Sequence, residues 1–199
     1  MAPKKPKSSG KTLHVTDPKT IRALASPLRM EILQTLDPAK PMTIAEIAEQ
    51  LGKPRGSLYY HVRKLIEIGV VVEAEQRLSG RRYESLYTVA AERLAVGADP
   101  ASPTGRAASE KLVLSMLRQV GREFQDALHS GDLDEEGEEF QAGRRQRAWL
   151  TPADLEQLQK AFDRIEKICT RREPGGDARL YSVLALVVPL RAETESGEE

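Results

Sequence analysis

Six residues between positions 55 and 64 carry groups that donate hydrogen bonds or allow close approach to another molecule. They are Arg55, Gly56, Ser57, Tyr60, Arg63 and Lys64. Arg63 can donate two hydrogen bonds to a guanine edge or to a phosphate, and Tyr60 can reach a phosphate or a thymine methyl group. Ser57 and Lys64 suit phosphate oxygens. Gly56 lets a backbone come close, and Arg55 stands at a helix N-terminus, which favours an anion. The set is typical of a nucleic-acid-binding surface.

Two short helices are expected to position these groups. Thr43 is a good N-cap and Glu46 lies three residues later, so the two can form a capping box. The apolar face of the first helix follows at helical spacing: Ile44, Ile47, Ala48 and Leu51. Gly52 can end this helix in a left-handed conformation, and Pro54 prevents its continuation.

The second helix carries the polar set on one side and an apolar set on the other. The apolar positions are Leu58, Val62, Leu65 and Ile66, and Gly69 ends the pattern. Two helices that cross at a steep angle need a small residue at their contact and a turn that permits the crossing. These needs are met, at the spacing of a helix-turn-helix, by Ala48, Gly52 and Leu58. Residues 43–69 therefore predict a helix-turn-helix that reads DNA with its second helix. The alternative is an ordinary amphipathic helix with a solvated outer face.

A hairpin is expected directly after these helices. Val70 to Val72 and Tyr83 to Val89 are β-branched and aromatic runs, and Ser79-Gly80 marks the tip between them. A helix-turn-helix followed by a hairpin is a winged helix. Three arginines near the tip would reach phosphates or the minor groove, namely Arg77, Arg81 and Arg82. An exposed charged loop is the alternative.

Two further helices precede this region. Asp17-Pro18 predicts a helix through Leu24, and Ser26-Pro27 predicts another that ends before Asp37-Pro38. They would supply an apolar floor for the helix-turn-helix, which gives a winged helix-turn-helix domain over residues 16–96. Residues 1–15 are basic, hold little to bury and are expected to be a disordered tail.

Residues 22–89 resemble the winged helix-turn-helix of bacterial ArsR-type repressors. The resemblance is carried by A-L-A-S-P-L-R-M-E-I-L-Q-T-L, I-A-E-I-A-E-Q-L-G and S-L-Y-Y-H-V-R-K-L-I-E-I-G-V-V. It implies a dimeric transcription regulator. The metal sensors of that family carry cysteines in the helix before the turn, where Ile44 to Leu51 has none, so no metal or other cofactor is expected. The chain is also longer than those sensors, and in this it is similar to regulators that add a C-terminal helical domain to the same wing.

The second half predicts a separate domain over residues 107–190. A linker rich in Gly, Pro and Ser, residues 97–106, marks the boundary, and a helix follows from Ala107 to about Ser130. The helix carries a wide apolar stripe: Leu112, Val113, Met116, Leu117, Val120, Phe124, Ala127 and Leu128. Part of a stripe this wide is expected to pack on a second subunit, with burial inside one chain as the alternative.

The rest of this domain predicts a helix and a small strand pair. Thr151-Pro152 starts the helix, whose apolar seam is Leu155, Leu158, Phe162, Ile165 and Ile168. Phe140 to Leu150 and Tyr181 to Leu190 are expected to be paired strands. Phe140, Trp149 and Tyr181 either line an effector pocket or belong to the core. Residues 191–199 are acidic and expected to be disordered. The fold class is therefore α+β: a winged helix-turn-helix followed by a mainly helical C-terminal dimerisation domain.

Charge and composition narrow the range of possible functions. Residues 1–95 carry 16 Lys and Arg against 10 Asp and Glu, while the remainder carries 14 against 20. A basic N-terminal half and an acidic C-terminal half are typical of a nucleic-acid-binding domain joined to a second domain that nucleic acid repels. The lone cysteine, Cys169, excludes an internal disulfide and suits a reducing compartment. No run is long enough to span a membrane, so a cytoplasmic protein is expected.

An enzyme is not expected. The histidines, His14, His61 and His129, have no partner at metal-ligand spacing, and no phosphate-binding glycine loop or nucleophile motif is present. The sequence predicts a homodimeric, cytoplasmic regulator that binds double-stranded DNA in a sequence-specific way. Two alternatives remain: a winged helix that only holds protein partners, and a regulator whose C-terminal pocket binds a small effector.

Overall fold

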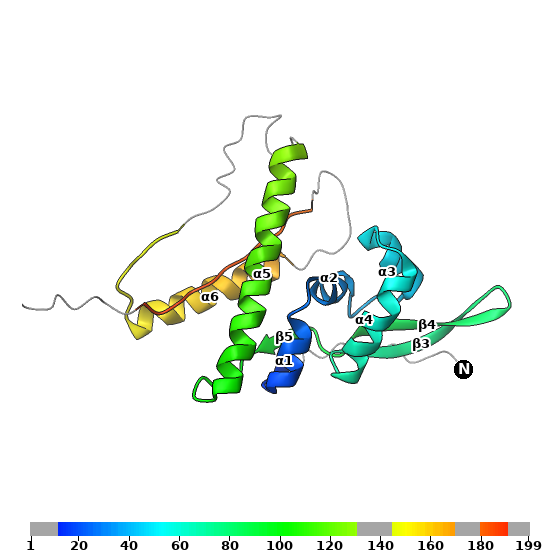
Figure 1. Ribbon diagram of the computed structural model, residues 1–199, viewed down its shortest axis with the longest axis horizontal. Coiled ribbons are helices and arrows are strands. Elements are labelled where there is room, and N and C mark those ends of the chain that lie inside the picture. The colour runs from blue at the N-terminus through cyan, green and yellow to red at the C-terminus, as the bar shows by residue number, and fades with distance from the viewer. Residues whose placement is uncertain (1–11, 131–144, 170–179, 191–199) are drawn as a thin grey trace, which may run out of the picture. The chain divides into compact units, whose positions relative to one another are not determined.

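The computed structural model describes residues 12–130, 145–169 and 180–190, and the chain divides into two units, Met1–Asp126 and Ala127–Glu199. The helices are α1 (Pro18–Leu24), α2 (Pro27–Thr35), α3 (Ile44–Leu51), α4 (Arg55–Glu67), α5 (Pro103–Ser130) and α6 (Pro152–Ile168). The strands are β1 (Thr12–Val15), β2 (Met42–Thr43), β3 (Val71–Ser79), β4 (Arg82–Val89) and β5 (Arg93–Val96). The fold is α+β, as the sequence predicts (Figure 1).

The core of the first unit lies between α1, α2, α3 and α4. Each helix contributes apolar side chains that are fully buried: Ile21, Leu24, Ile32, Ile47, Leu58 and Leu65. These are the positions that the helical periodicity selects, because one face of each helix must leave water for the four to pack. The two helices that precede the helix-turn-helix do form its apolar floor, as expected.

The connection between α3 and α4 follows from its local chemistry. Thr43 accepts a hydrogen bond from the Glu46 N–H at 3.2 Å, and the Glu46 carboxylate accepts one from the Thr43 N–H at 2.7 Å. This completes the predicted capping box. Gly52 ends α3 with φ 60°, in the left-handed region that favours glycine. The N-terminus of α4 is thereby fixed to the end of α3.

The wing is a three-stranded sheet in the order β2-β4-β3, and Figure 1 shows its hairpin reaching beyond α3 and α4. Ser79 pairs with Arg82, which leaves Gly80 and Arg81 as a two-residue turn. Of these two turn residues only Gly80, the first, has a positive φ, 62°, as a type II′ hairpin turn requires. Beyond Val71 every residue of β3 is exposed, whereas β4 packs Tyr87 and Val89 against the core cluster, so the hairpin is anchored at its base and held by its ladder towards the tip.

Two expectations for the ends of the first unit are wrong. Residues 12–15 are not part of a disordered tail, because they form β1, which runs parallel to β5. Val15 is buried in the core cluster there, a contact that a short apolar stretch can make once β5 supplies a ladder.

The linker expected at 97–106 is not the boundary: α5 begins at Pro103, and its Ala108 and Leu112 belong to the same core cluster. Residues 1–11 and 191–199 lie outside the described residues.

The second unit keeps the predicted helix but not the predicted strands. Thr151 caps α6 in a capping box with Asp154, and the expected seam lies along the helix. Residues 145–150 and 180–190 form no strand, so the expected strand pair is wrong for these residues; 140–144 lie outside the described ones. A strand needs a neighbour to pair its N–H and C=O groups, and neither sheet of the described chain includes these segments. Trp149 is 90% exposed and Tyr181 62%, so neither belongs to a core.

Candidate DNA-binding surface

Helix α4 presents most of the predicted polar set to solvent. Leu58, Val62 and Leu65 are buried and fix the rotation of the helix about its axis. On the other side, five of the six predicted residues are exposed, namely Arg55, Gly56, Ser57, Tyr60 and Arg63. At 100° per residue, Gly56, Tyr60 and Arg63 lie on the side opposite the buried stripe. Residues 55–63 of α4 therefore carry an exposed face with a phenol and a guanidinium and with little side-chain bulk at Gly56.

Lys64, the sixth residue, has a different environment. Its ammonium group forms an ion pair with Glu67 at 2.5 Å, and its side chain is 37% exposed. The hydrogen bond to Glu67 raises the pKa of Lys64, and the charge of Glu67 adds to this. Lys64 lies on the flank of the helix, and its charge is partly neutralised by a neighbour one turn away. A phosphate contact from Lys64 would have to compete with Glu67.

Ser57 is also engaged within the protein. Its hydroxyl donates a hydrogen bond to the carbonyl oxygen of Pro54 at 2.7 Å. A phosphate oxygen only accepts hydrogen bonds, so the hydroxyl must rotate away from Pro54 before it can donate to one. The exposed N-terminus of α4, with backbone N–H groups that have no partner inside the helix, is the more direct anion-binding feature at this point.

The ring of Tyr60 is oriented by residues outside the exposed face. The guanidinium of Arg29, from α2, lies 5.9 Å from the ring centroid, and the His61 ring meets Tyr60 edge-on at a centroid distance of 5.4 Å. Arg29 is itself held by a hydrogen bond to the carbonyl oxygen of Ala23. Burial, and then the charge of Arg29, lowers the pKa of His61, which keeps this imidazole neutral at pH 7. His61 is thus a packing residue beside Tyr60.

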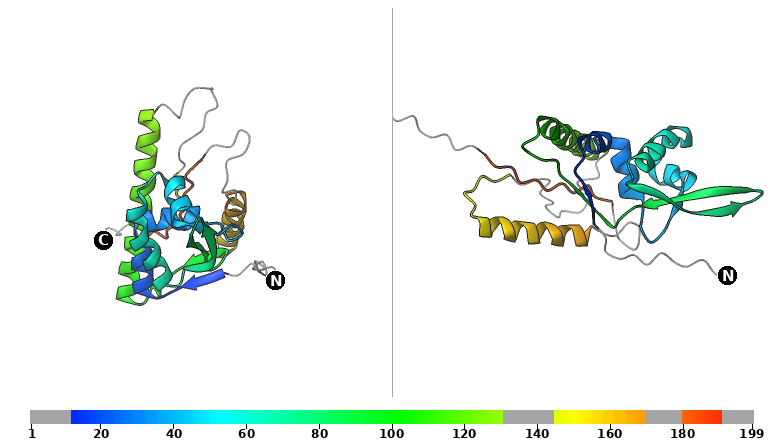
Figure 2. Two further views of the ribbon diagram at one scale, coloured as in Figure 1. Left: turned by 90° about the vertical axis from the view of Figure 1, so that its right-hand side faces the viewer. Right: turned by 90° about the horizontal axis from the view of Figure 1, so that it is seen from below.

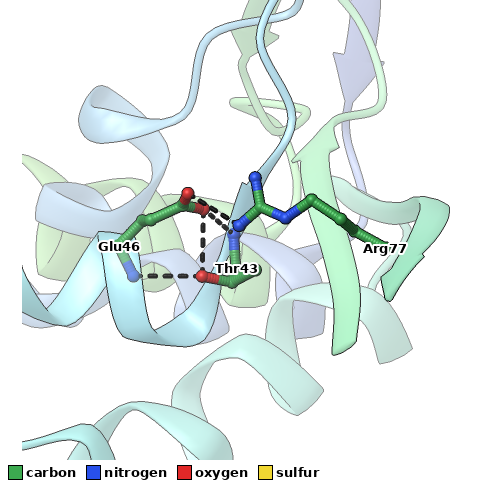
Figure 3. A network of polar contacts seen from close by, with 3 residues as sticks. All are labelled: Thr43, Glu46 and Arg77. Atoms are coloured by element: carbon green, nitrogen blue, oxygen red, sulfur yellow. Dashed lines mark hydrogen bonds and ion pairs between the residues drawn. The ribbon is translucent and has the colours of Figure 1, made fainter. Parts of the chain in front are cut away.

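The wing arginines divide into two groups. Arg81 and Arg82 are exposed at the turn, as predicted. Arg77 instead forms an ion pair with Glu46 of α3, with 2.9 Å between Nη2 and Oε1. Figure 3 shows the same carboxylate closing the capping box with Thr43 and meeting the Arg77 guanidinium. Arg77 therefore fastens the wing to α3, and the phosphate contact predicted for it would have to compete with Glu46.

Glu46 is the charged centre of this network. Burial raises the pKa of its carboxyl group, but hydrogen bonds from the Thr43 N–H, from Arg77 and from the Thr43 hydroxyl outweigh burial and hold the pKa below its ordinary value. The carboxylate is therefore ionised at neutral pH. One side chain stabilises both the start of α3 and the position of the wing beside it.

Tyr59 is a further exposed residue of α4 that the sequence pattern did not single out. Its side chain is 58% exposed, like that of Tyr60, and it lies on the flank of α4 next to Arg63. A helical wheel could have found it, because it falls outside the apolar stripe, but an uncharged aromatic is a weaker signal for phosphate contact than the arginines around it. Glu67 also lies opposite the buried stripe and is exposed, so the C-terminal end of the polar face carries the ion pair between Lys64 and Glu67.

Metal-binding clusters and membrane-spanning helices are absent from the described ranges 12–130, 145–169 and 180–190. No group of three or more His, Cys, Asp or Glu side chains there could hold a metal ion. None of the helices in those ranges is long and apolar enough to cross a membrane.

Comparison with known proteins agrees with the local geometry. Residues 24–74 match a family model described as a helix-turn-helix domain. A protein of Methanocaldococcus jannaschii, named as an uncharacterized HTH-type transcriptional regulator, is 38% identical over 65 residues. The match covers 33% of this chain and 66% of that protein, slightly less than two thirds of its length.

A structural comparison reaches further along the chain. The crystal structure of the multiple antibiotic-resistance repressor (MarR) from Listeria monocytogenes aligns with 77% of this chain and 81% of its own, with 14% identity and a TM-score of 0.26. A score this low carries no argument about the arrangement of the whole chain. The family match and the observed elements together show a helix-turn-helix domain that begins in α1 and runs into the first strand of a winged-helix hairpin.

Proposed function

We propose that this protein is a sequence-specific DNA-binding transcriptional regulator that acts as a homodimer, with α4 in the major groove and the wing on the DNA backbone. The observation that carries the proposal is the exposed face of α4 over residues 55–63. There Gly56, Tyr60 and Arg63 share one face, while the opposite face is locked into the core. A helix held rigidly at its back and polar at its front is the form in which a helix-turn-helix reads base edges.

Each group on this face has a defined role in the proposal. Arg63 donates to a guanine edge, or to a phosphate where no guanine is in reach. Tyr60, held by Arg29 behind it, contacts a phosphate or a thymine methyl group. Gly56 has no other atom within 4 Å of the position that a Cβ would take, so that point stays open to an approaching DNA backbone. The ion pair between Lys64 and Glu67 leaves little net positive charge at the C-terminal end of α4, which limits the contact to the first three turns of the helix.

The wing supplies contacts that do not depend on base sequence. Arg81 and Arg82 lie at the turn of the hairpin, where two guanidinium groups can meet phosphates or enter the minor groove. The ion pair between Arg77 and Glu46 holds the base of the hairpin against α3. The wing then approaches DNA in a fixed relation to α4, so α4 and the wing bind as one surface.

A homodimer is proposed because α5 has two apolar sides. Ala108 and Leu112 are buried in the first unit, whereas Leu114, Leu117 and Phe124 are each 42% exposed on the same helix. A second copy packed on the exposed side would cover them. It would also place two recognition helices on half-sites about one helical turn, ~34–36 Å, apart. Two linked recognition helices read twice as many base pairs, without any new type of contact.

The comparisons support the regulator class, since the matched protein is named as a transcriptional regulator and the matched domain as a helix-turn-helix. A module that only holds protein partners would carry acidic or apolar groups on the outer face of α4, where Tyr60 and Arg63 stand instead. A ligand-responsive regulator would need a pocket in the second unit. The described residues of that unit are exposed or half-buried throughout, so no observation favours this alternative.

Selection from random duplex DNA tests the proposal. The full-length protein should enrich a site made of two inverted half-sites whose centres lie about one helical turn apart. A single, non-repeated site would leave the reading by α4 in place but would contradict the homodimer. If no site is enriched above the input pool at physiological salt, the protein does not read DNA sequence and the proposal is wrong.

A further inference from the structure

The second unit has no buried residue among those that the structure describes. All of 127–130, 145–169 and 180–190 are exposed or half-buried, including the whole apolar seam of α6. Along α6, Leu155 is 47% exposed and Ile168 71%. A segment this rich in exposed apolar side chains is not stable in water, because leaving such surface solvated costs free energy in proportion to its area. These residues need a partner surface.

Residues 180–190, LYSVLALVVPL, are the most apolar part of this unit. Figures 1 and 2 show them as an extended trace with no helical turn. Seven large apolar side chains of the segment are exposed, namely Leu180, Tyr181, Val183, Leu186, Val187, Val188 and Leu190. The composition is that of a strand covered on both faces, yet neither sheet of the described chain includes it.

The structure points to a second copy of this chain as the occupant: we infer that residues 180–190 of two copies pair as antiparallel strands across a two-fold axis. The inference rests on the proposed homodimer and adds to it a contact outside α5. The α6 helices of the two copies would then cover the faces of the paired strands.

Three observations favour a second copy over an unrelated partner. First, residues 180–190 contain no charged residue, so identical segments can lie side by side without repulsion. Second, a two-fold axis makes an antiparallel pair self-complementary, so one segment is sufficient. Third, a stable interface uses about 20–30 residues a side, and the ranges 145–169 and 180–190 supply that many residues with none already buried.

Cysteine cross-linking on the full-length chain tests this pairing. Cys169 is the only cysteine and is exposed, so it is first replaced by Ser. Single cysteines are then placed at each position from 181 to 187, and the proteins are treated with a mild oxidant. A disulfide needs a Cβ–Cβ distance of about 3.5–4.5 Å. In a two-fold antiparallel pair only the residue nearest the axis meets its own copy, so cross-linking should peak at one position and fall at its neighbours.

Leu78→Cys in the same Cys169→Ser background is the matched control. Leu78 is 60% exposed on the wing and should report collisions alone. A peak at one position, at least ~5-fold above this control and unchanged on tenfold dilution, supports the pairing. Cross-linking that is level across 181–187, or no higher than the control, overturns it.

Sedimentation provides a second readout that does not need a disulfide. Leu186→Lys should raise the dissociation constant of the dimer at least ~10-fold, while Leu78→Lys leaves it unchanged. Leu186 is 48% exposed in the single chain, so its own fold should tolerate the lysine. A dimer that Leu186→Lys does not weaken but Leu117→Glu does would overturn the strand pairing and leave the proposed regulator intact. If the wild-type protein is a monomer, both the pairing and the homodimer are wrong, while DNA readout by α4 is judged separately.

Discussion

The ion pair between Arg77 and Glu46 predicts a measurable coupling between the wing and α3. The two side chains are 52% and 40% exposed and their charged atoms lie 2.9 Å apart, so water screens the pair but does not separate it. Exposed pairs of this kind contribute ~0.2–1 kcal/mol. We expect a small favourable coupling between Arg77→Ala and Glu46→Gln in 0.1 M salt, falling towards zero in 1 M salt, where the Debye length is ~3 Å.

The assay is a double-mutant cycle in urea unfolding with the wild type, both single variants and the double variant. Gln at position 46 keeps the capping box, because a glutamine at that position can accept the same hydrogen bonds. The cycle therefore isolates the charge interaction from the cap. A coupling indistinguishable from zero in 0.1 M salt would show that the wing is not fastened to α3 through this pair.

The same variant predicts a distinctive effect on DNA binding. Arg77→Ala loosens the wing without removing a phosphate contact, so affinity should fall on all sequences while the dependence on salt stays the same. If instead the slope of log K against log salt shrinks by about 0.9, the change expected when one phosphate contact is removed, Arg77 meets DNA directly and the assigned role is wrong.

Four further outcomes are expected. Arg81→Ala with Arg82→Ala should weaken binding to every duplex and reduce the salt slope by about 0.9 for each phosphate that is no longer neutralised, whereas an unchanged slope would mean that the hairpin stays off DNA. Gly52→Ala should destabilise the protein by ~1–2 kcal/mol in thermal unfolding, because the left-handed φ of 60° strains any residue with a Cβ; full stability would contradict the cap geometry. The pKa of Glu46 is lowered in the folded protein, so its contribution to stability is complete above the ordinary value of 4.5 and is lost as pH falls through the lower folded value. Glu46→Gln should therefore flatten the dependence of unfolding free energy on pH in that acid range and leave its shape near pH 7 unchanged. Leu117→Glu on α5 should raise the dissociation constant of the dimer, and a dimer that withstands it does not use this helix.

Much of the first unit follows from local rules that act within a few residues. The Thr43–Glu46 box, the left-handed Gly52 and the turn after Ser79 each need only neighbouring side chains, and all three are present. The apolar periodicity of α4 likewise identifies which side faces the core. Exposure of the predicted face follows from that, because a helix buried on one side presents the other.

The features that were not predicted depend on contacts between distant segments. The strand at residues 12–15 requires β5, some eighty positions later, and the ion pair of Arg77 requires a carboxylate on α3. The expected boundary at 97–106 failed for the same reason: Gly and Pro residues indicate a break in a helix but not whether the next helix packs back on the core. A fragment that ends at residue 97 would therefore lack the packing of Ala108 and Leu112.

The measurement that tests the central claim most directly compares wild-type protein with Arg63→Ala on the selected site and on random duplex of equal length. Arg63 is exposed, so thermal stability should barely change. Affinity for the selected site should fall by ~1–3 kcal/mol, with a much smaller loss on random DNA. Arg22→Ala, which removes an exposed charge from α1, should change neither affinity. Equal losses on both duplexes would show that α4 does not read bases.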